Sequence, residues 1–223
     1  MAYTTIDDPS AHRQTLLYTG NGSARSLTNT GNSDLQPDWV WIKERDNAVS
    51  HRVFDSTRGA GKRIFPNNTD AESTHTPAVT SFNSDGFSVG DGTSVNENGD
   101  LYVAFQWKAG GGSRTTFTES GDNPGGGYQA NTTAGFSIVD FVGTGANGTV
   151  QHGLGVAPRW YIVKNRDRST NWQVYHEDNG NTHYIKLNTT GAKLDNHEIF
   201  NDTSPTSSVF SVGIDQSVNF NGE

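Results

Sequence analysis

The chain has 223 residues, of which 31% are hydrophobic and 10% aromatic, and its formal net charge is −8. It contains no cysteine and no run of about 18 apolar residues, which excludes disulfide frameworks, thiolate metal sites and membrane-spanning helices. The acidic balance also argues against nucleic acid and anionic membrane surfaces as partners.

The N-terminal range 1–15 has neither a basic region nor an apolar stretch, so it does not read as a secretory signal. We expect the segment up to about His12 to be extended and to be ordered only by a partner. The protein is therefore expected to be made in a cytoplasm and to stay there or be packaged from there.

Short strand signals follow, separated by Asn-Gly, Asp-Gly and Gly-rich turns. Trp39 and Trp41 alternate with Val40 and Ile42, which predicts a central strand buried on both faces. The range 101–108 is the clearest strand, because aromatic residues recur there at every second position. The predicted strands of the first half are 13–18, 39–43, 51–55, 63–65, 79–82, 86–89 and 101–108.

A glycine-rich stretch over 111–135 separates the two halves and is predicted to be a linker, with a short strand within 114–118. The predicted strands beyond it are 136–142, 159–164, 172–175, 183–187, 198–200 and 209–212. No apolar pattern of helical period has useful length. Short strands at such spacing predict an all-β protein built of sandwiches or jelly rolls.

The chain contains an internal repeat. The ten residues from Pro37 match the ten from Pro158, with Pro, the first Trp, Lys, Arg and Asp in common. After a two-residue insertion, the range 87–90 matches the range 210–213. We therefore predict two tandem modules, module one over 16–110 and module two over 136–223, with 1–15 as an N-terminal docking segment.

Module two stops at Glu223, just before the counterpart of the strand over 101–108. A sandwich that lacks its final strand would expose apolar surface and an open edge. We expect either that the sequence is a fragment of a longer polypeptide or that a neighbouring subunit supplies the strand.

Three motifs resemble chemical sites, and for each of them the structural interpretation is favoured. Arg58-Gly59-Ala60-Gly61-Lys62 is too short for a phosphate loop and predicts a turn. The oxygen-rich range 91–100 lacks the EF-hand order and predicts a turn rather than a calcium loop. Trp172 and Tyr175 could stack on a sugar but are expected to lie in the core.

The seven histidines show no zinc spacing, although His176 and His183 could face each other across a hairpin. No nucleophile elbow is present. The sequence therefore assigns no catalytic, cofactor or metal residue and names no binding residue, and we expect that the protein is not an enzyme.

Several long sequence motifs resemble those of a known family. They include Pro37-Asp38-Trp39-Val40-Trp41-Ile42-Lys43, Ser84-Asp85-Gly86-Phe87-Ser88-Val89-Gly90 and Val103-Ala104-Phe105-Gln106-Trp107-Lys108. With His152-Gly153-Leu154-Gly155-Val156-Ala157-Pro158, they resemble a repeated β-sandwich domain of marine tailed-phage virion proteins. The resemblance implies concanavalin-like or laminin-G-like sandwiches and supplies no catalytic residues.

The resemblance implies a structural component of a tailed-phage virion, a tail fibre or appendage protein with its N-terminus docked on the particle. A capsid decoration or head-fibre protein and a host-glycan-binding adhesin are the alternatives. The implied partners are other virion proteins, reached through the N-terminal segment, and further copies of the chain in a trimer. Host surface glycans are the partner of the adhesin alternative, and neither nucleic acid nor membrane is expected.

Overall fold

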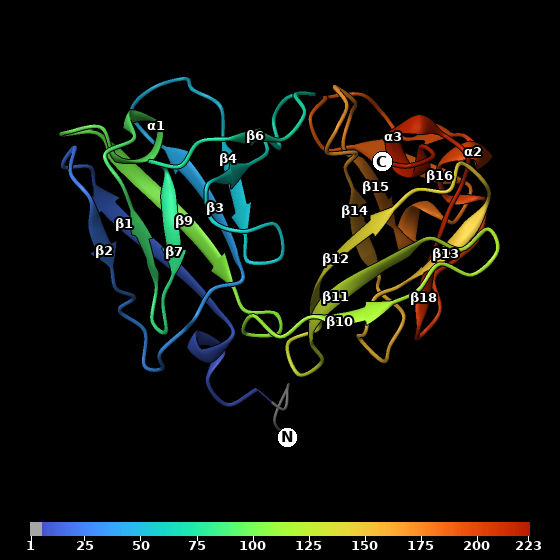
Figure 1. Ribbon diagram of the computed structural model, residues 1–223, viewed down its shortest axis with the longest axis horizontal. Helices are drawn as coiled ribbons and strands as arrows, with labels where there is room; N and C mark the ends of the chain where they lie inside the picture. Colours follow the sequence, from blue (N-terminus) through green and yellow to red (C-terminus); the bar gives the residue numbers. More distant parts are fainter. Residues whose placement is uncertain (1–5) are drawn as a thin grey trace. The chain divides into compact units, whose positions relative to one another are not determined.

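The computed structural model describes residues 6–223, and these residues are organised almost entirely as strands and turns (Figure 1). The chain divides into two compact units. Unit 1 comprises Met1–Phe65 and Ser73–Ser113, and unit 2 comprises Pro66–Glu72 and Arg114–Glu223. The fold is therefore all-β, as the sequence predicted.

Unit 1 begins with the 3-10 helix η1 (Pro9–Ala11) and includes one short helix, α1 (Thr93–Asn96). Its strands form a sheet of order β1-β9-β3-β4, a sheet of order β2-β8-β7 and the pair β5-β6. The strands are β1 (Arg13–Thr19), β2 (Arg25–Leu27), β3 (Trp39–Glu44), β4 (Arg52–Asp55), β5 (Lys62–Arg63), β6 (Ser73–Thr74), β7 (Val79–Phe82), β8 (Phe87–Val89) and β9 (Leu101–Trp107).

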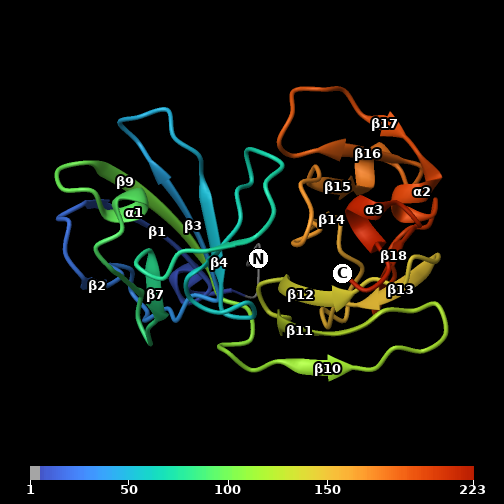
Figure 2. The same ribbon diagram turned by 45° about the horizontal axis from the view of Figure 1, so that its top comes forward.

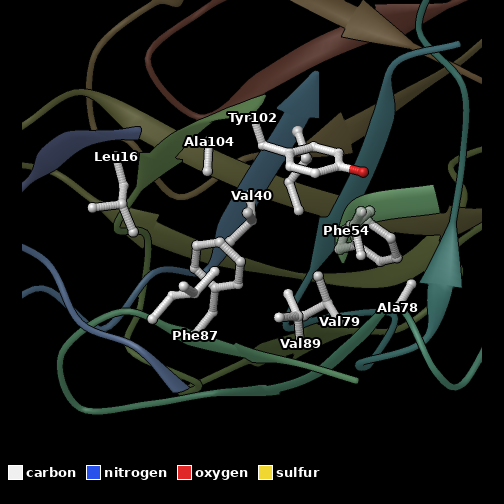
Figure 3. Packing of buried hydrophobic residues seen from close by; sticks show 12 residues of the cluster. Leu16, Val40, Phe54, Ala78, Val79, Phe87, Val89, Tyr102 and Ala104 are labelled. Carbon is white, nitrogen blue, oxygen red and sulfur yellow. The ribbon is translucent and has the colours of Figure 1, made fainter. Parts of the chain in front are cut away.

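The core of unit 1 lies between its two larger sheets (Figure 3). Val40 and Ile42 on β3 are fully buried there, and Phe87 on β8 packs against them from the opposite sheet. Alternation along a strand sends successive side chains to opposite faces. Trp39 and Trp41 accordingly point away from this core and are half-buried. The strand is central, as predicted, but only one of its faces is fully buried.

Unit 2 contains a sheet of order β10-β11-β12, a sheet of order β14-β15-β16-β17 and the pair β13-β18 (Figure 2). It also contains the 3-10 helix η2 (Glu177–Asn179) and two one-turn helices, α2 (His197–Phe200) and α3 (Gln216–Asn219). The strands are β10 (Thr115–Phe117), β11 (Gly125–Asn131), β12 (Phe136–Val142), β13 (Gly148–Gln151), β14 (Trp160–Val163), β15 (Gln173–His176), β16 (His183–Lys186), β17 (Leu194–Asp195) and β18 (Val209–Val212).

Strand pairings of unit 1 recur in unit 2 at the positions that the sequence repeat predicts. Trp39 pairs with Asp55 between β3 and β4, and Trp160 pairs with His176 between β14 and β15. The pair β2–β8 recurs as β13–β18 in the same register, and β5–β6 recurs as β16–β17. The repeat in the sequence is therefore a repeat in backbone pairing.

The prediction of a strand over 198–200 is wrong, because these residues belong to helix α2. Asn196 caps this helix, and its side chain accepts a hydrogen bond from the backbone N–H of Glu198 at 3.0 Å. An asparagine N-cap followed by an acidic residue in the first turn favours a helix start over a strand.

The glycine-rich range 111–135 is more than a linker, because it contains β10 and all of β11. Gly126 lies so close to β12 that an added Cβ would meet the carbonyl oxygen of Asp140 at 2.0 Å. A Cβ on Gly127 would meet the side chain of Arg114 at 2.4 Å. The glycines here permit close approach of neighbouring chain segments, a role that composition alone does not separate from flexibility.

The expectation that the N-terminal segment is extended until a partner orders it fails for residues 8–14. The Asp8 carboxylate accepts hydrogen bonds from the backbone N–H of Ser10 at 2.9 Å and from the hydroxyl of Ser33 at 2.6 Å. The side chain of Gln14 accepts one from Gly31 at 2.9 Å. This part of the segment packs on unit 1, whereas residues 1–5 lie outside the described part.

Candidate functional site

The oxygen-rich range 91–100, predicted to be a turn, contains the one-turn helix α1 and is organised around Asn96. Asn96 is buried, and its amide nitrogen donates to the carbonyl oxygens of Ser23 and Gly90, each at 2.8 Å. Its side-chain oxygen accepts from the backbone N–H of Asn21 at 3.1 Å. Among residues 6–223, no group of three or more His, Asp or Glu side chains is placed to hold a metal ion.

Four carboxylates nevertheless gather near the start of β9. Desolvation raises the pKa of Asp100, and the charges of Glu44, Glu97 and Asp46 raise it further. Asp46 also accepts a hydrogen bond from the backbone N–H of Leu101 at 2.7 Å. The hydrogen bond from Leu101 to Asp46 helps to fix the start of β9, although the four carboxylates repel one another.

Most of the range 58–62 forms a turn between β4 and β5, as predicted, and its last residue, Lys62, begins β5. The guanidinium of Arg58 forms an ion pair with Asp55 at 2.5 Å and donates to the carbonyl oxygen of Val53 at 3.1 Å. Gly59 and Gly61 have φ angles of +96° and +80°, which favour glycine. The arginine is thus engaged within the unit rather than directed to a phosphate.

The two histidines considered as a facing pair lie on neighbouring strands, and each contacts its own sequence neighbour. His176 accepts a hydrogen bond from the backbone N–H of Asp178 at 3.1 Å, and His183 contacts the hydroxyl of Thr182 at 2.8 Å. Trp172 and Tyr175, considered for sugar stacking, are each only 3% exposed. The structure places both aromatic side chains in the interior, as the sequence interpretation favoured.

Unit 1 also carries an open depression of about 510 Å³. Small and polar residues line it, and no aromatic side chain is among them. They are Gly22, Ser23, Ala24, Thr76, Pro77, Thr80, Gly90 and Asp91. Because sugar sites present aromatic faces to the ligand, this lining does not favour a glycan site.

The strongest candidate site consists of two strand edges in unit 2, which we call the acceptor edges. In unit 1, β9 lies between β1 and β3 and pairs with both. The counterparts of β1 and β3 are β12 and β14, and among the described strands β12 pairs with β11 alone and β14 with β15 alone. The acceptor edges are the outer edges of β12 and β14.

The C-terminal residues Gly222 and Glu223 contact the residue that follows β12. Gly143 donates to the carbonyl oxygen of Glu223 at 2.7 Å and accepts from the N–H of Gly222 at 2.8 Å. In unit 1, Gly20 donates to Asp100 at 2.8 Å and accepts from Gly99 at 3.0 Å, and β9 starts directly afterwards. Glu223 therefore stands where the strand between the two edges starts in unit 1.

Glu223 also contacts the loop that follows β14. Its carboxylate accepts a hydrogen bond from the side chain of Asn165 at 3.2 Å and pairs with Arg168 at 2.5 Å. The Arg168 guanidinium holds the pKa of Glu223 below its ordinary value. Glu223 thus connects the residue that follows β12 with the loop that follows β14.

Apolar side chains along the acceptor edges are more exposed than their counterparts in unit 1. Val139 is half-buried where Leu16 is buried, and Tyr161 is half-buried where Val40 is fully buried. Trp160 is 53% exposed. In the sequence, this site is indicated by a repeat that stops before a counterpart of β9. The structure adds that β12 and β14 lie in the positions of β1 and β3.

The fold and the candidate site together define a class of protein: an all-β chain with an internally repeated strand framework, in which β12 and β14 each pair with one neighbour among the described strands. A family model described as "Domain of unknown function (DUF7483)" matches residues 8–223, and the chain belongs to this family. Comparison with curated proteins and with solved structures found no match. None of the helices in the described range is long and apolar enough to cross a membrane.

Proposed function

We propose that the protein is a structural component of a tailed-phage virion, a tail fibre or appendage protein whose partners are other virion proteins. In this proposal both units are versions of one jelly-roll sandwich, and the molecule assembles as a trimer. Its work is to build the exterior of a particle rather than to turn over a substrate. The family resemblance of the sequence supplies the location, and the structure supplies reasons for an assembly role.

The observation that carries the assembly role is the exposure of large apolar side chains on β12 and β14 in unit 2. Exposed apolar side chains that lie together form a surface suited to contact with another polypeptide. Trp160 and Val142, 53% and 51% exposed, lie on these two strands. In an assembly, contact with a neighbouring protein would remove this apolar surface from water.

The use of buried polar side chains supports the same proposal. Asp38 is buried and accepts hydrogen bonds from three backbone N–H groups, those of Ala109, Gly111 and Gly112. Asn96 likewise binds backbone groups around it. These buried polar side chains satisfy backbone groups in loops and turns and so stabilise the fold. Such a role is consistent with a structural protein.

Mass spectrometry of gradient-purified particles made from the genome that carries this gene tests the proposal. The protein should co-purify with the particles in a fixed ratio to the other structural proteins. Gold-labelled antibody against it should mark the tail, whereas label on the head would favour the capsid decoration protein. Its absence from purified particles would overturn the proposal.

A further inference from the structure

We propose that unit 1 binds a tetrahedral oxyanion, a phosphate or sulfate group, between the side chains of Arg52, Arg63 and His75, which we call the basic cluster. Every residue of the cluster belongs to unit 1, and the proposal goes beyond the assembly role without depending on it. A local excess of positive charge is unexpected in a chain whose formal net charge is −8.

Strand pairing places the two arginines of the cluster on one face. Arg52 lies two residues before Phe54 on β4, so both side chains point to the same face of that strand. Val53 pairs with Ile64, the residue that follows β5. Arg63, next to Ile64, therefore lies on the face of Arg52 and Phe54.

His75 reaches the same face from the neighbouring segment. Arg63 pairs with Ser73 between β5 and β6, and its Nε donates a hydrogen bond to the Ser73 hydroxyl at 3.0 Å. Two residues further on, the backbone N–H of His75 donates to the carbonyl oxygen of Gly61 at 2.7 Å, which continues this pairing. Alternation turns His75 to the face of Arg63, and diagonal neighbours of this kind are about 7–8 Å apart.

The three groups disfavour one another's positive charge. Burial lowers the pKa of Arg52, and the charge of Arg63 lowers it further, against an opposing effect of Glu44. Burial also lowers the pKa of His75, and the charges of Arg63 and Arg52 add to that effect. A bound anion would offset this repulsion.

The donors of the cluster are only partly used by the protein. Among residues 6–223, neither arginine of the cluster forms an ion pair with a carboxylate. Arg52 donates to the carbonyl oxygen of Ser50 at 2.8 Å, whereas its Nε is buried without an acceptor in the same range. Buried donors are normally paired, so this one indicates a missing acceptor such as an ion.

Arg63 is held in an orientation that suits binding. Its guanidinium lies over the ring of Phe65 at 5.3 Å, and Ser73 accepts the hydrogen bond from its Nε. The side chains of Arg63 and His75 are half-buried, so solvent reaches part of each. A guanidinium fork binds phosphate or sulfate through two parallel N–H donors, and four tetrahedral oxygens serve several donors at once.

Unit 2 shows that the strand framework does not require these charges. The pairing of Ile42 with Arg52 recurs as Val163 with Gln173. The pairing of β5 with β6 recurs as β16 with β17. In the equivalent positions unit 2 carries the neutral residues Gln173, Tyr184 and Asn196. The three basic side chains of unit 1 therefore serve a purpose other than strand pairing.

Isothermal titration calorimetry with sodium sulfate and sodium phosphate, at an ionic strength held constant with sodium chloride, tests the proposal. We expect saturable binding of one anion per chain. The cluster variant combines Arg52→Gln, Arg63→Tyr and His75→Asn, the residues that unit 2 carries, and should bind about tenfold more weakly or worse. No saturable binding of either anion, or unchanged affinity of the cluster variant, would overturn the proposal.

The matched control removes two positive charges elsewhere. Arg13→Gln combined with Lys193→Gln changes two exposed positions and should leave the anion affinity unchanged. An equal loss of affinity in this control would show a general charge effect and overturn the proposal. The single variants Arg63→Gln and His75→Asn, each expected to weaken binding about threefold or more, decide if the cluster variant does not fold.

A measurement on the unaltered protein reports on the site itself. In an NMR pH titration, sulfate should raise the pKa of His75 relative to chloride at the same ionic strength, because a bound anion favours the charged imidazole. The spectrum of His75→Asn identifies the resonance. The same pKa in both salts would overturn the proposal.

Dextran sulfate and unmodified dextran distinguish a free ion from an ester group on a larger molecule. Tighter binding of dextran sulfate than of inorganic sulfate, at equal sulfate concentration, would support the proposal and assign the site to esters. Equal affinity would support it with the free ion as ligand. Dextran sulfate binding that the cluster variant leaves unchanged, or that unmodified dextran reproduces, would overturn the proposal.

Discussion

Asn219 stands in unit 2 where Asn96 stands in unit 1, and both buried side chains join the same backbone positions. The Asn219 amide nitrogen donates to Ala146 at 2.5 Å and to Gly213 at 2.9 Å, and its oxygen accepts from Thr144 at 2.9 Å. Asn96 makes the equivalent bonds in unit 1. The repeat therefore preserves the polar framework that fixes the start of the strand between the two edges.

Replacing either asparagine should destabilise its own unit. Asn96→Ala and Asn219→Ala each leave several buried backbone groups unpaired, so we expect each to lower the free energy of unfolding by about 3 kcal/mol. Denaturant titration followed by tryptophan fluorescence measures the change. The matched control is Asn98→Ala at an exposed position, which should change stability by less than about 0.5 kcal/mol. Equal effects at Asn96 and Asn98 would contradict the assigned role.

Asp38 anchors the loop that follows β9. Because the buried carboxylate accepts three backbone N–H groups and the Ser56 hydroxyl, Asp38→Ala should lower the free energy of unfolding by about 3 kcal/mol. Its sequence counterpart is Arg159, whose side chain is 75% exposed. Arg159→Ala should leave the melting temperature nearly unchanged, because exposed ion pairs contribute little to stability. Thermal melts of both variants make the comparison, and a tolerated Asp38→Ala would refute the anchoring role.

Gly143 permits close contact between the end of β12 and the C-terminal turn. An added Cβ would meet the carbonyl oxygen of Phe220 at 2.3 Å, so Gly143→Ala should destabilise unit 2 by about 1–3 kcal/mol. Gly191→Ala is the control, since its Cβ would have only an ordinary contact at 3.7 Å. Chemical denaturation of the two variants decides. Similar midpoints would show that the turn does not hold the strand end as described.

Asp100 should give stability a pH dependence of defined sign. Desolvation and the nearby carboxylates raise its pKa in the folded state above the unfolded value near 3.8. Its contribution to stability is fully present below pH 3.8 and is lost as pH rises through the folded value. Asp100→Asn does not titrate, so its stability should exceed that of the wild type at neutral pH and approach it in acid. Urea titrations at several pH values test this, and an advantage that grows in acid would contradict the sign.

Most of the strand framework could be predicted from the sequence. The predicted ranges 79–82, 136–142 and 209–212 have the same bounds as β7, β12 and β18. Alternating apolar residues flanked by glycine or asparagine turns gave a clear signal at these places. The repeat predicted that both halves contain versions of one module, and the strand pairings that recur in the two units were found only in the structure.

Other elements carried too little local signal. Strand β11 begins with three glycines, and its pairing depends on the approach of β12 rather than on strand propensity. Helix α1 has no side-chain cap at Gly92, so its four residues read as a turn. Helix α2 did carry a signal in its asparagine cap, which was outweighed by the apolar Ile199 and Phe200.

The candidate site was only partly predictable. The repeat showed that the sequence stops before a counterpart of β9, but not which strands lie beside that position. That knowledge depends on which residues of β12 and β14 face β11 and β15, which is a matter of tertiary pairing. The backbone contacts of Gly143 supplied it.

Residue-resolved amide hydrogen exchange tests the central claim most directly. In the isolated protein, the amides of Val139 and Ile162 on the acceptor edges should exchange much faster than those of their counterparts Leu16 and Trp41, which pair with β9. Equal protection of all four amides would contradict the account.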